Sequence, residues 1–318
     1  MNTRKLLVLT LVLAVLAGGL WHLRASREGA DMLTSESLRS FVPPGLVATV
    51  DAVDLTRPDN STVRLEKRDG RWVLPALGGA PANASSIERM LTALVELRGE
   101  HRSSDPAVLG DYELLDEQAM SLILWEGGKE RVRLLFGKGD FRHVFVREAG
   151  SPDVSVVPGA IVGQLGAYGP TLSPQFWIDG TLLSVSGSDV RELRLHAPGI
   201  DAVLSRQPSA GSDSANATAA PEWDFRQTAG KGLAQRQMEE ILGVLERVPV
   251  TEAVYPANPG EAFPSHRLEV VTASGATVLE GAPDGDGFLV RVAGSPHLYR
   301  MGPAVFGRLF PAPDGTPE

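Results

Sequence analysis

An internal repeat is the feature of the sequence that most constrains the fold. Segment 145–165, FVREAGSPDVSVVPGAIVGQL, aligns without gaps with segment 289–309, LVRVAGSPHLYRMGPAVFGRL, at a constant offset of 144. Nine of the 21 aligned positions are identical, which chance explains poorly. Each copy predicts a strand, an Ala-Gly-Ser-Pro turn, a second strand and a short helix, because glycine and proline supply the backbone angles of the turn.

The repeat continues upstream at changed offsets. Segments 63–67 and 72–74 predict a hairpin, and segments 202–206 and 223–225 predict its counterpart, with Trp72 and Trp223 on the two second strands. The offset grows from 139 before the hairpin tip to 151 after it, so the second copy has twelve additional residues there. This stretch is rich in Ser, Ala, Gly and Asn, and we expect residues 207–221 to form a flexible surface insertion.

A helix is expected after each tryptophan. Residues 85–88, Ser-Ser-Ile-Glu, have the spacing of a capping box that begins the first helix. Apolar residues then follow at helical spacing, and they recur in the second copy at the offset of 151, which predicts that one face of each helix packs on a sheet. The two faces are Ile87, Met90, Leu91, Leu94 and Leu97, and Met238, Ile241, Leu242, Leu245 and Val248.

Two further hairpins complete the pattern, one from 121–126 and 131–136 and the other from 266–272 and 277–280. The predicted fold class is α+β: two tandem copies of an antiparallel-sheet-plus-helix unit after an N-terminal transmembrane helix. The predicted divisions are a cytoplasmic head 1–5, an anchor 6–23, a stalk 24–46, a first repeat domain 47–169, a connector 170–183, a second repeat domain 184–312 and a tail 313–318.

The anchor is predicted from the uncharged apolar run Leu6 to Leu23, LLVLTLVLAVLAGGLWHL. As a helix it would measure about 27 Å, close to the thickness of a bilayer's hydrocarbon core. A cleaved signal peptide is the alternative, since small residues occur at Val15-Leu16-Ala17. The apolar run continues beyond that point through Trp21, which favours a permanent anchor. Three positive charges precede the segment and two follow closely, so we expect a cytoplasmic N-terminus and an extracytoplasmic soluble region.

Composition excludes several classes of protein. The net charge of −9 opposes binding to phosphate backbones, so no nucleic-acid partner is expected. The chain has no cysteine, which excludes disulfides, thiolate metal sites and a lipid-anchored lipoprotein. Glycine and proline are frequent, at 34 and 23 residues, and indicate short strands and many turns rather than an all-helical fold.

No motif predicts catalysis or cofactor binding. The six histidines lack zinc-ligand spacing, and no GxSxG or SxxK pattern occurs. Residues 136–140, FGKGD, lack the spacing of a phosphate loop, and residues 284–287, DGDG, lack the later ligands of a calcium loop, so both are predicted turns. We therefore expect no catalytic, cofactor-binding or metal-binding residues, no cofactor and no enzymatic activity. A carboxylate pair of the glycosidase kind stays possible, without residues to assign to it.

Six short motifs together resemble a bacterial family of unknown function, whose members have an N-terminal membrane segment and a repeated domain. The chain departs from it at Glu113, where glycine is usual, at a proline missing shortly afterwards, and at residues 177–180, where Arg-Asp-Lys is usual. The motifs are Trp72-Val73-Leu74-Pro75, Tyr112-Glu113-Leu114, Phe136-Gly137, Val144-Phe145-Val146, Val154-Ser155-Val156-Val157 and the segment 176–183.

The resemblance implies association with gliding-motility-type ABC transport systems in the bacterial envelope. The expected function is therefore a non-enzymatic auxiliary or scaffold protein, held in the cytoplasmic membrane by a single pass through Leu6 to Leu23, with ABC transporter subunits as partners. The alternative is a glycan-binding module or hydrolase of the envelope with unidentified carboxylates. The oligomeric state is not predicted.

Overall fold

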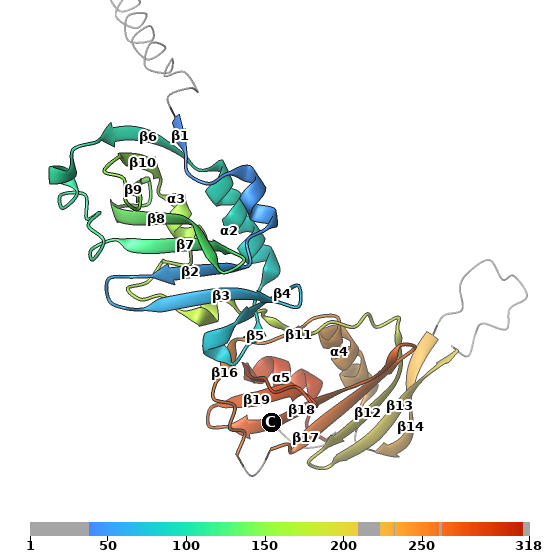
Figure 1. The fold of residues 1–318 in the computed structure, drawn as a ribbon. Helices are drawn as coiled ribbons and strands as arrows, with labels where there is room; N and C mark the ends of the chain where they lie inside the picture. The colour runs from blue at the N-terminus through green and yellow to red at the C-terminus, as the bar shows by residue number, and fades with distance from the viewer. Residues whose placement is uncertain (1–37, 209–222, 232, 261–262, 314–318) are drawn as a thin grey trace, which may run out of the picture. The chain divides into compact units, whose positions relative to one another are not determined.

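The computed structural model describes residues 38–208, 223–231, 233–260 and 263–313 (Figure 1). The predicted head, the anchor and the stalk up to residue 37 lie outside these ranges, as do residues 209–221 of the predicted insertion and residues 314–318 of the tail. Within the described ranges, no helix is long and apolar enough to cross a membrane.

Backbone contacts divide the chain into two compact units. Of the described residues, the first unit contains 38–51, 55–60 and 89–171, and the second contains 52–54, 61–88 and those from 172 onward. The predicted connector 170–183 is folded: its residues from 172 onward belong to the second unit, and the Trp177 side chain is 1% exposed.

The larger sheet has ten strands in the order β1-β6-β10-β9-β8-β7-β2-β3-β4-β5. It is antiparallel from β1 to β7 and from β3 to β5. Its strands are β1 (Leu38–Ser40), β2 (Ala52–Thr56), β3 (Thr62–Arg68), β4 (Arg71–Leu74), β5 (Ala80–Pro81), β6 (Arg98–Ser103), β7 (Met120–Glu126), β8 (Lys129–Gly139), β9 (His143–Glu148) and β10 (Val154–Pro158).

Two α-helices lie among the residues of this first half, α2 (Ala84–Glu96) and α3 (Ala160–Gln164). The predicted face of α2 is confirmed, since Ile87, Met90 and Leu94 are all 0% exposed. Short 3₁₀ turns follow prolines at η2 (Pro44–Ala48), η3 (Pro75–Leu77) and η4 (Pro106–Val108).

The N-cap of the first helix lies two residues before the predicted capping box. The Asn83 side-chain Oδ1 accepts a hydrogen bond from the Ser86 backbone N–H at 2.9 Å, so Asn83 is the capping residue and Ser85 is an exposed helical residue. Asn is as effective an N-cap as Ser, because its short side chain reaches the free N–H groups of the first turn.

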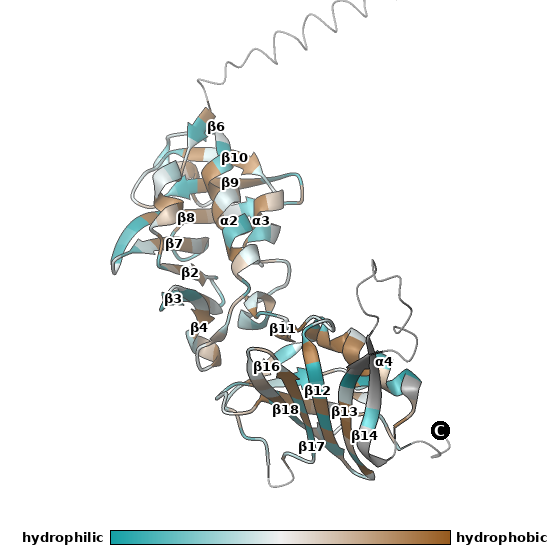
Figure 2. Cartoon of the chain, turned by 90° about the vertical axis from the view of Figure 1, so that its right-hand side faces the viewer, coloured by the Kyte–Doolittle hydropathy of each residue, from teal (hydrophilic) through white to brown (hydrophobic). Residues whose placement is uncertain are grey.

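The second sheet has eight strands in the order β14-β13-β12-β17-β18-β19-β20-β16 and is antiparallel throughout. Buried and outward side chains alternate along most of β12. Figure 2 marks the hydropathy of the residues of this strand, brown for hydrophobic and teal for hydrophilic. The strands are β12 (Val190–Ala197), β13 (Ile200–Pro208), β14 (Trp223–Lys231), β16 (Glu252–Val254), β17 (His266–Thr272), β18 (Gly275–Asp284), β19 (Gly287–Val292) and β20 (Leu298–Met301).

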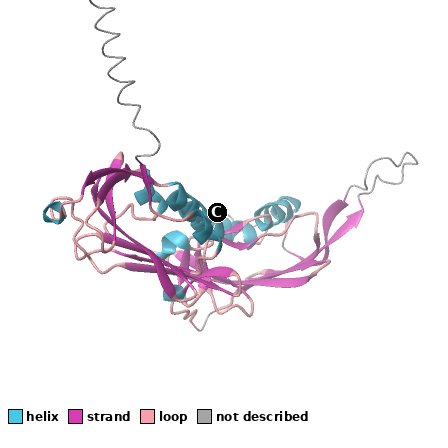
Figure 3. Ribbon diagram, turned by 45° about the horizontal axis from the view of Figure 1, so that its top comes forward, coloured by secondary structure: helices cyan, strands magenta, loops and turns pink. Residues whose placement is uncertain are grey.

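The remaining elements of the second half are η5 (Pro174–Trp177), the small sheet of β11 (Thr181–Leu183) and β15 (Val248–Pro249), α4 (Gln235–Leu245) and α5 (Pro303–Leu309). Figure 3 shows α4 and α5 on the same side of the eight-stranded sheet. The predicted apolar face of α4 is confirmed at Met238, Ile241 and Leu245, but the helix ends before Val248, which lies in β15.

The predicted hairpins are present, and the fold class is α+β. Asp284 pairs with Gly287 at the tip between β18 and β19, so the DGDG segment is a hairpin turn, as predicted. The FGKGD segment differs, because β8 continues through Gly139. Gln207 and Pro208, placed in the insertion by the sequence analysis, pair with Asp224 and Trp223 at the end of β13.

Residues 38–46, assigned to the polar stalk, belong to the folded region. Leu38, Arg39 and Ser40 form β1 and pair with β6. Phe41 and Val42 follow and are 6% and 1% exposed. The seat for Phe41 is Gly99 of β6: a Cβ there would lie 2.7 Å from the Phe41 ring, so a side chain at position 99 would displace the ring. We call this arrangement the β1 seat.

Each sheet has one edge that is covered in its own way. In the ten-stranded sheet, β1 covers β6 with backbone hydrogen bonds. In the eight-stranded sheet, the edge strand β16 is covered by the Gln175 side chain, which donates to the Ala253 carbonyl at 2.7 Å and accepts from the Ala253 N–H at 2.9 Å. Unpaired edges promote unwanted strand pairing, and a side-chain amide satisfies the same two backbone groups as a strand would.

Removing the Asn83 cap tests the corrected helix start. We expect Asn83→Ala to lower the free energy of unfolding by about 1 kcal/mol, because one N–H of the first turn loses its acceptor. Urea unfolding followed by circular dichroism measures the change. Ser85→Ala is the matched control and should leave stability unchanged or slightly raised; a larger loss from Ser85→Ala than from Asn83→Ala would restore the capping box predicted from sequence.

Candidate functional site

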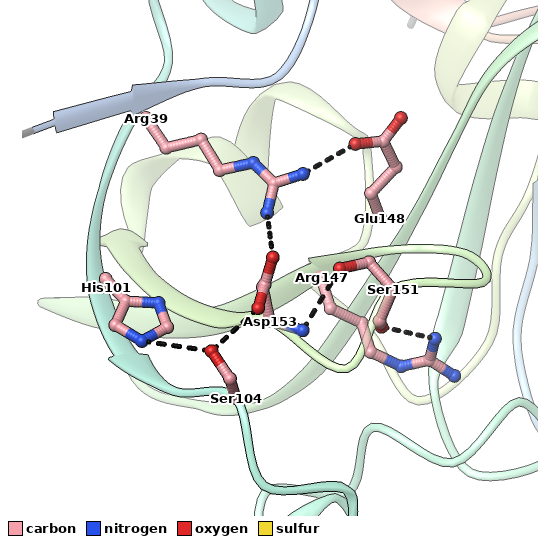
Figure 4. Close-up of polar contacts among 7 residues, drawn as sticks. All are labelled: Arg39, His101, Ser104, Arg147, Glu148, Ser151 and Asp153. Carbon is pink, nitrogen blue, oxygen red and sulfur yellow. Dashed lines mark hydrogen bonds and ion pairs between the residues drawn. The ribbon is translucent and has the colours of Figure 1, made fainter.

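A cluster of polar side chains fastens β1 to the Ala-Gly-Ser-Pro turn (Figure 4). Arg39 donates to Glu148 Oε2 at 2.7 Å and to Asp153 Oδ2 at 3.2 Å. These two carboxylates flank the turn, so the motif that repeats in the sequence is also the part of the sheet that receives β1. We call Arg39, Glu148, Asp153, Ser104 and His101 the β1 cluster.

Ser104, His101 and Asp153 do not form a catalytic triad. The Ser104 hydroxyl donates to Asp153 Oδ1 at 2.7 Å. The Ser104 Oγ atom also lies 3.4 Å from His101 Nε2. In a triad the histidine stands between serine and carboxylate and removes the hydroxyl proton. Here the carboxylate takes the hydroxyl hydrogen bond directly, and the whole group is exposed. The arrangement holds a strand in place and does not activate a nucleophile.

The charge of Asp153 is stabilised by its neighbours. Hydrogen bonds from Ser104 and Ser151, together with the charges of Arg39 and His101, hold the pKa of Asp153 below its ordinary value of 3.8. A lowered pKa stabilises the folded state above the ordinary value, and this contribution is lost as the pH falls through the lowered pKa. Asp153 is therefore an ionised acceptor and a weak base.

The arginine shared by the two repeated segments has two different environments. Arg147 is 5% exposed; its Nε donates to the Leu114 carbonyl at 2.7 Å, and its guanidinium also contacts Asp116 and the Ser151 carbonyl. Arg291 instead donates to Glu280 at 2.9 Å and lies 4.8 Å from the centre of the Phe263 ring. Both arginines hold backbone or side chains together within their own sheet.

A groove of about 590 Å³ lies on the other face of β1 and β6. Its charged residues are Arg98, Glu100 and Arg102, which alternate along β6, His143, the first residue of β9, and Arg142, which precedes it. We call it the arginine groove. Residues at every second position of a strand share a face, which brings the two β6 arginines to the same side.

Aromatic and apolar side chains form the rest of the arginine groove. Tyr112 and Phe145 pack with ring centres 4.4 Å apart, and His143 stands edge-on to Phe145 at 5.9 Å. Leu38 of β1 lines the groove from one side. Glu113, next to Tyr112, has a positive φ of 54°, a backbone conformation that suits glycine. This explains why glycine is usual in the Tyr-Gly-Leu motif that the segment resembles.

Two other hollows lie among the described residues. One, of about 810 Å³, is lined by hydroxyl side chains around Asp189, Arg191 and Arg206, but several of these hydroxyls make local turn contacts, such as Ser186 with Ser188 and Thr272 with Ser274. The other, of about 450 Å³, contains Glu126 and Glu130.

Carboxylate pairs of the kind that a glycosidase needs are engaged with arginine. Glu126 pairs with Arg131 at 3.1 Å and Glu130 with Arg133 at 2.5 Å, all four at an exposed hairpin. A general acid of that kind needs burial or a neighbouring like charge, whereas these carboxylates lie at solvent-accessible positions beside arginine. The same holds for Glu252 and Asp284, which both contact Arg300.

The histidines of the described residues have different environments. His266 packs against Phe306 and Phe310, and burial lowers the pKa of His266, as it does that of His297. His101 belongs to the β1 cluster, His143 to the arginine groove, and His196 to β12, while His22 lies outside the described residues. Across the described ranges, no group of three or more His, Asp or Glu is arranged to hold a metal ion.

Sequence reasoning assigned no site residues, and it missed both the β1 cluster and the arginine groove. The signal for the groove was the alternation of Arg98, Glu100 and Arg102, which is typical of a strand with one exposed face. The cluster had no local signal, because Arg39 and Asp153 are 114 residues apart.

Removing the Ser104 hydroxyl tests the electrostatics of the β1 cluster. We expect Ser104→Ala to raise the pKa of Asp153 toward 3.8, since the largest cause of its lowering is removed. Carboxyl ¹³C NMR titration measures this pKa. Asp140 is the internal control, because its pKa is lowered mainly by backbone N–H groups of His143 and Arg142. An unchanged Asp153 would mean that Ser104 does not donate to it.

The family described as a domain of unknown function, DUF4340, matches residues 72–263, from Trp72 in β4 to the segment before β17. The match covers more than half of the chain. No curated protein and no solved structure matched.

Proposed function

The chain belongs to the family described as a domain of unknown function, DUF4340, and we propose that it is a membrane-anchored, non-enzymatic scaffold or auxiliary protein of an ABC-type transport system. In this proposal Leu6 to Leu23 cross the cytoplasmic membrane once and the two sheets lie outside the cytoplasm. The ATPase and the permease are separate chains.

The β1 seat is the observation that carries the proposal. A tether can hold a domain in a defined position only if the chain enters the fold soon after it leaves the membrane. Leu38 already pairs with β6, Phe41 is buried over Gly99, and Arg39 joins the sheet at two carboxylates. Leu38, where β1 begins, is 15 residues after Leu23.

We further propose that the two sheets are tandem copies of one unit. The order β6-β10-β9-β8-β7-β2-β3-β4 in the larger sheet corresponds, strand by strand, to β16-β20-β19-β18-β17-β12-β13-β14 in the smaller one. The helices follow the same pattern, with α2 and α4 after the tryptophan strands and α3 and α5 after the last strands. β1 and β5 are additions to the first copy, and they cover its two edges.

Exposed aromatic side chains support a docking role. Tyr168 is 80% exposed and Tyr255 is 59% exposed. Exposed large apolar groups often belong to surfaces that another protein covers, where Tyr contributes strongly to affinity. The association with ABC transport itself rests on the family resemblance of the sequence motifs.

Site-specific crosslinking in intact cells tests the proposal. A photo-crosslinkable residue at Tyr168 should yield a covalent adduct with an ABC transporter subunit, identified by mass spectrometry, because the exposed ring marks the contact. The same residue at Glu117, an exposed polar position of the same unit, is the matched control and should yield no such adduct.

A C-terminal alkaline phosphatase fusion checks the placement in the same cells. An active fusion with no transporter subunit crosslinked from Tyr168 would contradict the auxiliary role, and a stable but inactive fusion would reverse the topology.

A further inference from the structure

The arginine groove has an unusual charge for this chain, and we propose that it binds the phosphate headgroups of anionic phospholipids, so that this face of the sheet rests on the membrane. The inference builds on the proposed anchor and names the surface that the anchored unit presents to the bilayer.

The groove contains more positive than negative charge. Arg98 makes its hydrogen bonds to neutral acceptors, among them the Val95 carbonyl at 2.7 Å and the Leu97 carbonyl at 3.0 Å. Arg102 forms an ion pair with Glu100 at 3.4 Å. The Arg142 guanidinium stacks on Phe141, 5.3 Å from the ring centre.

The groove and its border contain two acidic side chains, Glu100 and Asp140, and four basic ones, three arginines and His143. Asp140 already accepts the backbone N–H groups of Arg142 and His143, and it lies 3.3 Å from His143 Nδ1. The rest of the chain is strongly acidic, with a net charge of −9 overall. An anionic membrane surface would therefore attract this groove and repel most other faces, which orients the unit.

The position of the groove on the chain favours a lipid over a soluble anion. Leu38, which lines it, is the first described residue, and residues 24–37 separate it from the predicted anchor. Fourteen residues span at most about 50 Å when fully extended. The groove consequently stays close to the bilayer at all times, where the effective concentration of headgroups is high.

An exposed aromatic ring stands beside the groove. Phe141, in the turn between β8 and β9, is 82% exposed, the highest value among the large hydrophobic side chains of the described ranges. An aromatic residue next to arginine is the pattern that proteins place at the membrane interface, where the ring enters the headgroup region and the cation meets phosphate. The Tyr112–Phe145 pair supplies an apolar floor for the glycerol part of a lipid.

A single fluorescent label tests the proposal on the full chain. Because the chain has no cysteine, Phe141→Cys provides one attachment site for an environment-sensitive dye. The labelled protein is reconstituted into nanodiscs of phosphatidylcholine alone or with about 30% phosphatidylglycerol. We expect a blue shift and stronger emission only in the anionic discs, reversed at about 0.5 M salt because ionic screening weakens the attraction.

Charge variants identify the groove as the source of the signal. The double substitution Arg102→Gln and Arg142→Gln should abolish the shift, with circular dichroism showing an intact fold. The charge-matched double substitution Arg191→Gln and Arg236→Gln, at exposed positions of the second unit, should leave it unchanged.

The outcomes separate this inference from the anchor. A chain that fails to copurify with any disc contradicts the anchor. If the chain copurifies with the discs but the dye shows the emission of an aqueous environment in both lipid compositions, headgroup binding is wrong and the anchor is still supported. A shift produced without discs by inorganic phosphate or by poly-glutamate also overturns it, in favour of a soluble anion or an acidic protein partner.

Discussion

The seating of β1 against β6 is the constraint on which the account depends. Three residues of strand are too few to hold themselves in a sheet, because the backbone entropy lost on ordering them is comparable to what their hydrogen bonds return. Two further contacts provide the additional stabilisation that β1 needs. Phe41 is buried over a position where only glycine leaves room, and Arg39 joins two carboxylates across the neighbouring turn. The predicted stalk thereby ends in a fixed strand.

The same strand separates two surfaces of different character. Leu38 lines the arginine groove and Arg39 belongs to the β1 cluster, because successive side chains of a strand point to opposite faces. In the cluster, Arg39 pairs with two carboxylates. In the groove, Arg98 bonds to neutral acceptors and Arg102 pairs with one carboxylate, that of Glu100, so positive charge exceeds negative charge there. Structural and binding roles are thus divided between neighbouring residues.

The sequence predicted the regular part of the fold, because periodic burial leaves a local pattern. The hairpins and the apolar faces of α2 and α4 were found from spacings of two and of three to four residues. What the sequence did not reveal depends on distant partners. The Asn83 cap, the Gln175 side chain that covers β16 and the pairing of Arg39 with Asp153 each join or replace elements that only the folded chain brings together. Glu113 is an intermediate case: the sequence showed that it replaces a usual glycine, but only the structure shows that its φ is positive.

Hydrogen–deuterium exchange at β1 in the full chain tests the central claim most directly. Amide exchange of the peptide covering residues 38–42 reports whether this segment is part of the sheet. We expect this peptide to exchange about as slowly as the peptide covering β6, and we expect Phe41→Ala to accelerate its exchange while the peptide covering β17 is unaffected. Exchange of residues 38–42 at the rate of an unstructured chain in the unsubstituted protein would contradict the account, since the tether would then be joined to the fold by a loose linker.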